Sequence, residues 1–172
     1  MDDWQALIRE VPDFPRAGVA FKDITPLLAD ADGFNAAVEA MAMPWRGVAL
    51  DAVFAIESRG FILGAALARA LGLGFVPVRK AGKLPATVHA QAYTLEYGSD
   101  QLEVHADAVA PGARVLLVDD VLATGGTLAA ALALARLQGA FVVGASVLIE
   151  IPALEGRARW DPELPLEAAI RD

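Results

Sequence analysis

The feature that most restricts the fold of this chain is the alternation of short apolar, β-branched runs with longer Ala- and Leu-rich stretches. Strand patterns cover Ala52 to Ile56, Phe75 to Val78, Arg114 to Val118 and Phe141 to Ile149. Helical patterns cover Asp32 to Met43, Phe61 to Leu71 and Thr127 to Gln138. Glycine or proline marks the breaks, and such alternation is typical of strand–helix–strand units. We therefore predict an α/β fold with a central, mostly parallel sheet flanked by helices.

Other segments depart from this alternation. A helix is predicted from Asp2 to Glu10, and residues 11–29 hold too many prolines for a regular element, so we expect them to form an ordered cover. Residues 79–85 form a basic segment with Gly and Pro, which predicts a mobile loop. Gln91 to Tyr97 and Gln101 to His105 alternate around residues 98–100, which predicts a β-hairpin that acts as a lid. Residues 151–172 are weakly patterned.

Size and composition narrow the class of protein. With 172 residues, 56% of them hydrophobic, the chain is long enough for one sizeable core, so we expect residues 1–172 to form a single domain. The lack of cysteine, of a signal-peptide pattern and of an unbroken membrane-length stretch predicts a soluble, cytoplasmic protein that contacts no membrane. A net charge of −8 argues against nucleic-acid binding. An anionic small substrate would need local cations, backbone N–H donors and Mg²⁺ to offset that charge.

The segment from Val115 to Thr127 carries the strongest functional signal. A buried strand is followed by Asp119 and Asp120, and a turn of small residues at 123–126 then opens a helix. Exposed N–H groups at a helix start, together with threonine hydroxyls, suit a phosphate monoester. The two carboxylates would repel phosphate but accept hydrogen bonds from a diol, and ligands bind at the carboxyl ends of strands in open α/β sheets. The segment therefore predicts a site for a ribose 5-phosphate.

Residues 115–127 resemble the signature of the type I phosphoribosyltransferases, which bind 5-phosphoribosyl 1-pyrophosphate (PRPP). The resemblance implies that Asp119 and Asp120 hold the ribose hydroxyls, directly or through Mg²⁺ that PRPP itself mainly binds. It also implies a cradle for the 5′-phosphate made of Ala123, Thr124, Gly125, Gly126 and Thr127.

Three further segments resemble the adenine phosphoribosyltransferases of that family: residues 14–28, 76–85 and 93–98 match the purine-covering segment, the basic loop and the flexible hairpin. The resemblance implies a homodimeric purine salvage enzyme that converts adenine and PRPP to AMP and pyrophosphate. The implied adenine-binding residues are Ala20, Phe21, Lys22 and Ile151, with backbone hydrogen bonds from Ala20 and Lys22. The implied pyrophosphate-binding residues are Ser58, Arg59, Arg79, Lys80 and Lys83, and part of that basic loop reaches the neighbouring subunit's site in this family.

The implied catalytic residues are Glu96, Arg59 and Tyr97. Adenine must lose a ring proton as its N9 attacks the anomeric carbon, and Glu96 matches the carboxylate assigned to this acid/base step. Tyr97 would close the lid and exclude water.

Several alternatives remain open. Glu96 could be a solvent-facing strand residue, and Phe21 could be a core aromatic. Arg79, Lys80 and Lys83 could form a solvated run of charges. Glu57 is interpreted as an acid that orients Arg59. The substrate could instead be an oxo-purine such as xanthine or hypoxanthine, or the chain could be a PRPP-sensing regulator without catalysis. The regulator hypothesis predicts a DNA-binding module or a basic face, and the acidic sequence indicates neither.

Overall fold

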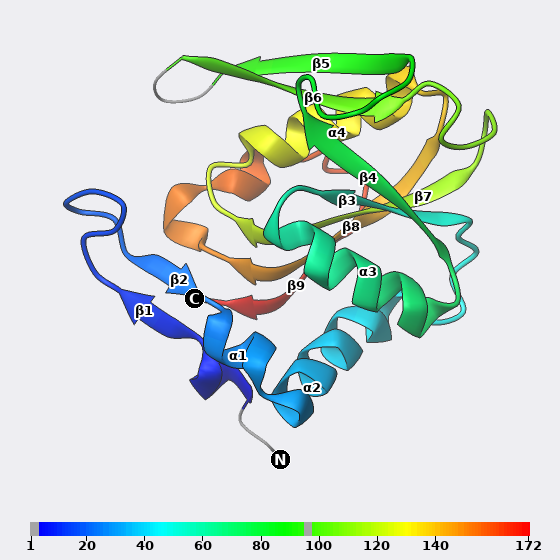
Figure 1. Ribbon diagram of the computed structural model, residues 1–172. Coiled ribbons are helices and arrows are strands. Elements are labelled where there is room, and N and C mark those ends of the chain that lie inside the picture. The colour runs from blue at the N-terminus through cyan, green and yellow to red at the C-terminus, as the bar shows by residue number, and fades with distance from the viewer. Residues whose placement is uncertain (1–3, 95–97) are drawn as a thin grey trace.

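A seven-stranded sheet forms the centre of the computed structural model, which describes residues 4–94 and 98–172 (Figure 1). The strand order is β5-β6-β4-β3-β7-β8-β9. The strands are β3 (Ala52–Ile56), β4 (Gly74–Lys80), β5 (Val88–Thr94), β6 (Ser99–His105), β7 (Arg114–Leu122), β8 (Phe141–Glu150) and β9 (Leu166–Arg171). Neighbouring strands from β4 to β9 pair in parallel, whereas β6 pairs antiparallel with both β4 and β5. The predicted mostly parallel α/β sheet and the hairpin are thus confirmed.

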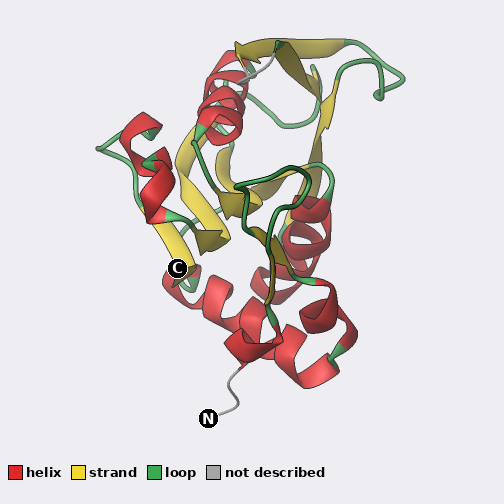
Figure 2. Cartoon of the chain, turned by 90° about the vertical axis from the view of Figure 1, so that its left-hand side faces the viewer, coloured by secondary structure: helices red, strands yellow, loops and turns green. Residues whose placement is uncertain are grey.

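Helices cover both faces of this sheet. The helices α2 (Ala31–Ala42) and α3 (Arg59–Leu71) pack on one face, and α4 (Gly126–Leu137) packs on the other, as the rotated view in Figure 2 shows. Strand β3 is buried along its whole length, with Val53 and Ala55 in the core under α2 and α3, and Phe54 and Ile56 in the core under α4. Successive strand residues point to opposite faces, so a run of five apolar residues fits a strand that is covered on both sides.

Local signals fix where the helices begin and end. The Asp30 side chain caps α2 by accepting a hydrogen bond of 2.7 Å from the Gly33 N–H. At the end of α3, Gly72 adopts φ 71°, a left-handed conformation that glycine adopts without steric cost. The three helices predicted at residues 32–43, 61–71 and 127–138 therefore agree with the structure to within two residues at each end. No helix among the described residues is long and apolar enough to cross a membrane.

The N-terminal segment differs from the predicted helix between Asp2 and Glu10. A 3-10 helix, η1, covers Trp4–Leu7, and β1 (Arg9–Val11) pairs antiparallel with β2 (Phe21–Asp23). The prediction was wrong at residues 9–10 because their partners lie across a loop, where Arg9 bonds the Asp23 carboxylate at 2.6 Å. The short helix α1 (Thr25–Ala29) follows, so the expected cover is ordered and contains more regular structure than its prolines suggest.

Three element boundaries also needed correction. Strand β7 continues through the two acids to Leu122, because it keeps pairing with β8 as far as Leu122 and Glu150. Arg79 and Lys80 belong to β4, where they pair with β6, and not to a loop. In the weakly patterned C-terminal stretch, two 3-10 helices, η3 (Pro152–Leu154) and η4 (Gly156–Arg159), lead into β9. The remaining 3-10 turn, η2, covers Met43–Trp45.

Candidate active site

A cavity of about 700 Å³ lies beyond the carboxyl ends of β3, β4 and β7. Open α/β sheets bind ligands at this edge, because the strand ends and the helix starts deliver side chains and N–H groups there. The lining residues that the sequence predicted for the site are Ala20, Phe21, Lys22, Ser58, Arg59, Lys80, Asp119, Asp120, Ala123, Thr127 and Ile151. Residues that are spread over most of the sequence therefore lie together in one pocket.

The small-residue turn between β7 and α4 forms a second, smaller hollow of about 60 Å³ beside the first. Thr124, Gly125 and Gly126 line it together with Ala123 and Thr127, which also line the larger cavity. Gly125 adopts φ 82° immediately before α4, so the N–H groups of the first helical turn have no carbonyl partners within the helix. This arrangement suits a group of phosphate size and charge.

The two acids that precede this turn lie at the pocket floor. The Asp120 N–H donates a hydrogen bond of 2.8 Å to Asp119 Oδ1. Burial and the neighbouring Asp120 carboxylate raise the pKa of Asp119 well above its ordinary value. Gly60 allows α3 to start against these acids, since a Cβ atom there would lie 2.9 Å from Asp119 Oδ1. A nearby positive charge would stabilise the ionised forms of these two buried carboxylates.

Arg59 supplies part of that charge and connects three parts of the pocket. Its Nε lies 2.6 Å from Asp120 Oδ2, and its Nη1 donates to the Lys22 carbonyl oxygen at 3.1 Å. Its guanidinium carbon also lies 4.7 Å from the centre of the Phe21 ring, a cation–π geometry. The side chain thus ties the predicted purine cover to the floor of the pocket.

Glu57 does not orient Arg59, as the sequence interpretation had proposed. Its carboxylate accepts hydrogen bonds from Arg79 Nε at 3.0 Å and from the Lys80 N–H at 2.8 Å. The reason is strand pairing, because the Glu57 N–H bonds the Val78 carbonyl and this places Glu57 beside the end of β4. Glu57 is therefore an acid that orients Arg79.

The predicted pyrophosphate-binding residues fall into two groups. Ser58, Arg59 and Lys80 line the cavity, whereas Arg79 and Lys83 do not. Arg79 is held by Glu57, and its guanidinium carbon lies 5.8 Å from the centre of the Phe61 ring. The structure therefore brings three of the five residues together within this chain.

The hairpin of β5 and β6 overhangs the cavity. Thr94 pairs with Ser99, so β6 begins within the segment 98–100 where the turn was predicted, and Tyr93 and Asp100 line the pocket. Burial raises the pKa of Tyr93, and Lys80 Nζ lies 3.1 Å from Asp100 Oδ2. Glu96 and Tyr97, the predicted catalytic residues of the hairpin, lie outside the described residues.

Sequence reasoning missed several lining residues. They are Gly18, Val19, Ile56, Glu57, Tyr93, Asp100, Leu102, Val121, Ala153 and Leu154. The alternation of β5 could have placed Tyr93 on one face of the hairpin, but it could not say which face turns inward. Nothing local in residues 151–154 indicates a pocket wall.

A charge cluster outside the cavity holds the purine cover in place. Lys22 Nζ contacts Glu10 Oε2 at 2.6 Å and Asp172 Oδ2 at 2.5 Å, and only 10% of the Lys22 side chain is exposed. Hydrogen bonds to Asp172 and Glu10 raise the pKa of Lys22. Figure 1 shows the two elements involved, β2 and the end of β9, side by side. The Lys22 side chain therefore points away from the pocket, and its backbone is what faces Arg59.

The carboxylates of Asp119 and Asp120 are chemically suited to Mg²⁺. This ion prefers oxygen ligands and is usually bound by one or two carboxylates plus substrate phosphates. Burial and then the Asp120 carboxylate raise the pKa of Asp119, and a divalent cation would favour its ionised form. Among the described residues, no group of three or more His, Cys, Asp or Glu side chains is arranged to hold a metal by itself.

This fold, with a phosphate-sized turn after two acids at the sheet edge, defines a phosphoribosyltransferase, and residues 47–163 match the family described as the phosphoribosyl transferase domain. An adenine phosphoribosyltransferase from Xanthomonas campestris pv. campestris (strain B100) is 59% identical over 97% of this chain and 90% of its own length. The chain belongs to the adenine phosphoribosyltransferase family.

Solved structures agree with this assignment. The crystal structure of adenine phosphoribosyltransferase from Thermoanaerobacter pseudethanolicus ATCC 33223 matches with a TM-score of 0.95 at 47% identity, covering 99% of both chains. The enzyme from Giardia lamblia, in complex with 9-deazaadenine, matches with a TM-score of 0.93 at 42% identity, covering 99% of this chain and 96% of its own.

Proposed function

We propose that this protein is a purine salvage enzyme that transfers the phosphoribosyl group of PRPP to N9 of adenine, giving AMP and pyrophosphate. The observation that carries the proposal is one pocket with two chemically different halves. One half holds two carboxylates and the phosphate-sized turn at 123–127, and the other holds Phe21 and Ile151 beside the backbone of β2. A ribose 5-phosphate fits the first half and a flat heterocycle fits the second.

The 5′-phosphate of PRPP would sit in the hollow lined by Ala123 to Thr127, where backbone N–H groups and threonine hydroxyls donate to its oxygens. The ribose 2′- and 3′-hydroxyls would donate to Asp119 and Asp120. This order along β7 and its turn fixes the direction of the sugar and aims its anomeric carbon toward the centre of the larger cavity.

Adenine would lie between Phe21 and Ile151, with backbone groups of Ala20 and Lys22 meeting its polar edge. Apolar faces with a few placed polar groups are the usual composition of such sites. A backbone carbonyl accepts from the 6-amino group of adenine but cannot pair with the 6-oxo group of hypoxanthine or xanthine, so it selects adenine. The contact of Arg59 Nη1 with the Lys22 carbonyl oxygen supports a fixed position for this backbone.

Displacing pyrophosphate builds positive charge on the ribose and negative charge on the leaving group. Ser58, Arg59 and Lys80 line the side of the pocket where the pyrophosphate would leave. The Arg59 and Lys80 cations would stabilise its charge, and the Ser58 hydroxyl could donate a hydrogen bond to it. Mg²⁺, held mainly by PRPP and in contact with Asp119 and Asp120, would neutralise leaving-group charge when bound. Glu96 would accept or share the N9 proton of adenine, with Tyr97 closing over the site.

Arg79 and Lys83 fit the proposal best if two copies of this chain associate. Neither residue lines the cavity of its own chain, and the neighbouring surface is apolar, with Ile62 and Phe75 exposed by 44% and 37%. The Phe75 ring packs on Phe61 at a centroid distance of 5.6 Å, close to the Arg79 guanidinium. We propose that this face forms a homodimer and carries the basic residues to the partner's pyrophosphate, and that the enzyme works in the cytoplasm with residues 1–172 as one catalytic domain.

A spectrophotometric assay tests the proposed function. PRPP and Mg²⁺ are supplied with adenine, hypoxanthine, guanine or xanthine separately, and the nucleotide product is identified. AMP from adenine alone is the expected result. Turnover of an oxo-purine only would overturn the assignment of adenine, and PRPP binding without turnover would favour a regulator.

A further inference from the structure

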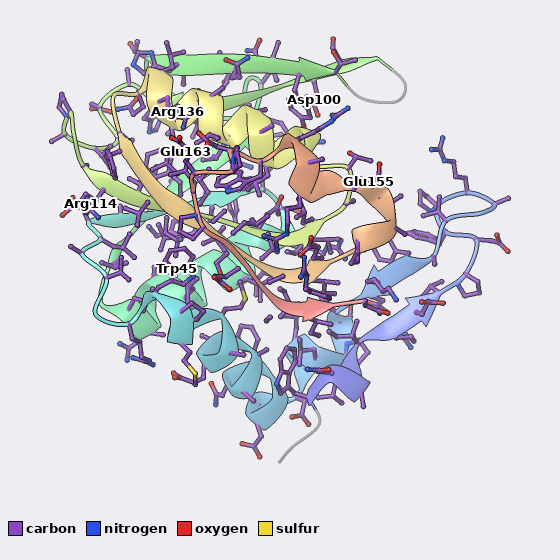
Figure 3. The ribbon with its side chains drawn as sticks, turned by 180° about the vertical axis from the view of Figure 1, so that it is seen from behind. Trp45, Asp100, Arg114, Arg136, Glu155 and Glu163 are labelled. Carbon is purple, nitrogen blue, oxygen red and sulfur yellow. The ribbon has the colours of Figure 1, made fainter. Side chains whose placement is uncertain are left out.

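The C-terminal 3-10 helix η4 packs directly against the phosphate turn through two glycines. A Cβ atom on Gly125 would overlap the Gly156 carbonyl oxygen, and a Cβ atom on Gly156 would overlap the Ala123 carbonyl oxygen. Two backbones can approach this closely only where neither carries a side chain. Residues 156–159 therefore have a fixed position relative to the turn at 123–127. Figure 3 shows Glu155 on the bend that leads into η4.

The residues on either side of Arg159 are firmly anchored. Arg157 bonds the Glu150 carboxylate through Nη2 at 2.6 Å and Nε at 2.9 Å, and its Nη1 donates to the Leu166 carbonyl at 2.9 Å. Trp160 is buried, and its Nε1 donates to the Leu164 carbonyl at 2.9 Å. The backbone at Arg159 is thus held in place, which limits the positions that its guanidinium can reach.

That guanidinium lies over the phosphate turn. Its Nη1 is 3.2 Å from the position that a Cβ atom of Gly126 would occupy. Arg159 and Arg16 line a third hollow, which shares Thr124, Gly126 and Thr127 with the hollow of about 60 Å³. Within residues 4–94 and 98–172, the Arg159 side chain forms no hydrogen bond or ion pair. By contrast, Arg136 on the neighbouring α4 is paired with Asp161 at 2.5 Å.

The residues of the phosphate turn carry no positive charge themselves. Residues 121–128 contain no lysine or arginine, two carboxylates precede them, and the chain carries a net charge of −8. The cations of the larger cavity already have carboxylate partners, Arg59 with Asp120 and Lys80 with Asp100, and the Lys22 ammonium is paired outside the cavity with Glu10 and Asp172. A phosphate monoester is close to a dianion at neutral pH, and an arginine is the side chain that best matches its oxygens.

We propose that Arg159 binds the 5′-phosphate of PRPP and of AMP across the turn at 123–127. The inference rests on the proposed function, since it adds a residue to the same phosphate site. Arg159 would raise the affinity for every ligand that carries the 5′-phosphate. It would leave the affinity for adenine and pyrophosphate unchanged, because these ligands do not reach the turn.

Calorimetric titration of AMP and of adenine into wild type, Arg159→Ala, Arg159→Lys and Arg136→Ala tests this role. Arg136→Ala is the matched control, because it removes a nearby arginine that is already paired. We expect AMP to bind Arg159→Ala about 10-fold more weakly or worse, with partial recovery in Arg159→Lys, and with no change for adenine or for Arg136→Ala. The salt dependence of AMP binding should also be weaker in Arg159→Ala.

Equal AMP affinity in wild type and Arg159→Ala would overturn the inference and leave the proposed function standing. Equal losses for AMP and adenine would also overturn it, because they would indicate a distorted pocket in place of a lost phosphate contact. If wild type bound neither AMP nor PRPP, the proposed function itself would fail together with the inference.

Discussion

Arg59 and Asp120 form an ion pair across the floor of the pocket, with 2.6 Å between Nε and Oδ2. Because the same guanidinium also bonds the Lys22 carbonyl and covers Phe21, it couples the sugar-binding acids to the adenine-binding strand. The pair compensates one of two adjacent buried carboxylates and holds the guanidinium close to the Phe21 ring. A lysine could supply the charge but not these three contacts together.

Replacing Arg59 by lysine should therefore lower kcat/KM for PRPP by about 10²-fold, with a smaller rise in the KM for adenine. Steady-state kinetics with each substrate varied in turn measures both effects. Arg69→Lys serves as the control, since Arg69 is in the last turn of the same helix, away from its start at the pocket. Kinetics of Arg59→Lys close to wild type would remove Arg59 from the catalytic residues.

Asp119→Asn should raise thermal stability and lower activity. The pKa of Asp119 is raised in the folded protein, so its ionised form is disfavoured there, and folding loses stability as pH rises from the unfolded pKa of 3.8 through the folded value. An asparagine removes that penalty at pH 7 while its Oδ1 can still accept from the Asp120 N–H. We expect a Tm a few degrees higher, by scanning calorimetry, with PRPP turnover reduced.

Asp120→Asn provides the comparison, because it removes the carboxylate partner of Arg59 and should not stabilise the fold. A Tm of Asp119→Asn at or below the wild-type value would show that the Asp119 carboxylate is compensated in the unliganded protein. A higher Tm for Asp119→Asn would mean that the paired carboxylates serve ligand binding and lower the stability of the unliganded protein.

Glu150 should make the fold sensitive to acid. Hydrogen bonds from Arg157 and from Arg171 lower the pKa of this carboxylate to about 2. A lowered folded pKa gives stability that is fully present above the unfolded value of 4.5 and is lost as pH falls toward 2. The contribution at pH 7 is about 3.5 kcal/mol at most, because the pKa falls from 4.5 to about 2 and each pKa unit corresponds to roughly 1.4 kcal/mol.

Urea unfolding at pH 7 and pH 3 measures this loss. Wild type should lose more free energy of unfolding between the two pH values than Glu150→Gln does, because the variant has no carboxylate to protonate. Identical losses in the two proteins would place the acid sensitivity elsewhere. Glu39→Gln is a suitable control, since Glu39 and its partner Arg46 are both exposed.

The parts of the fold that were predictable from sequence are those specified by local pattern. Strand β3 is covered on both faces and reads as one unbroken apolar run, and the turn at 123–127 contains the glycines that its backbone requires. The acids, the turn and the following helix could be placed together for the same reason. The acids, the turn and the helix are adjacent in the sequence and also in the folded chain.

The remaining features depend on contacts between distant residues. Strand β1 exists because it pairs with β2, and Lys22 is held by Asp172, 150 positions further along the chain. Glu150 ties η4 to β9, because its carboxylate bonds both Arg157 and Arg171. Only the folded chain reveals that Gly156 touches the phosphate turn, so Arg159 could not be associated with that site from its sequence position.

The close packing of Gly125 on Gly156 predicts that a methyl group on either one disturbs the phosphate turn. Gly125→Ala also forces a residue with φ 82° to carry a side chain. We expect both Gly125→Ala and Gly156→Ala to weaken PRPP and AMP binding by about 10-fold or more, with adenine binding less affected. Gly47→Ala is the control, since Gly47 has φ 79° but open space around it, so it should lose stability without losing ligand affinity.

The last prediction concerns Glu96, which belongs to the hairpin between β5 and β6 but lies outside the described residues. Tyr93 and Asp100, two described hairpin residues that precede and follow it in the sequence, line the cavity. Loss of a general acid/base group lowers turnover by about 10²-fold or more, while the binding of PRPP, which does not need this proton, should change little. Glu96→Ala and Glu96→Gln should behave alike, because both remove the ionisable group. Single-turnover kinetics measure the rate of the chemical step, and PRPP titration measures the affinity for PRPP separately. Near-normal turnover in either variant would exclude Glu96 from proton transfer and assign that step to another group.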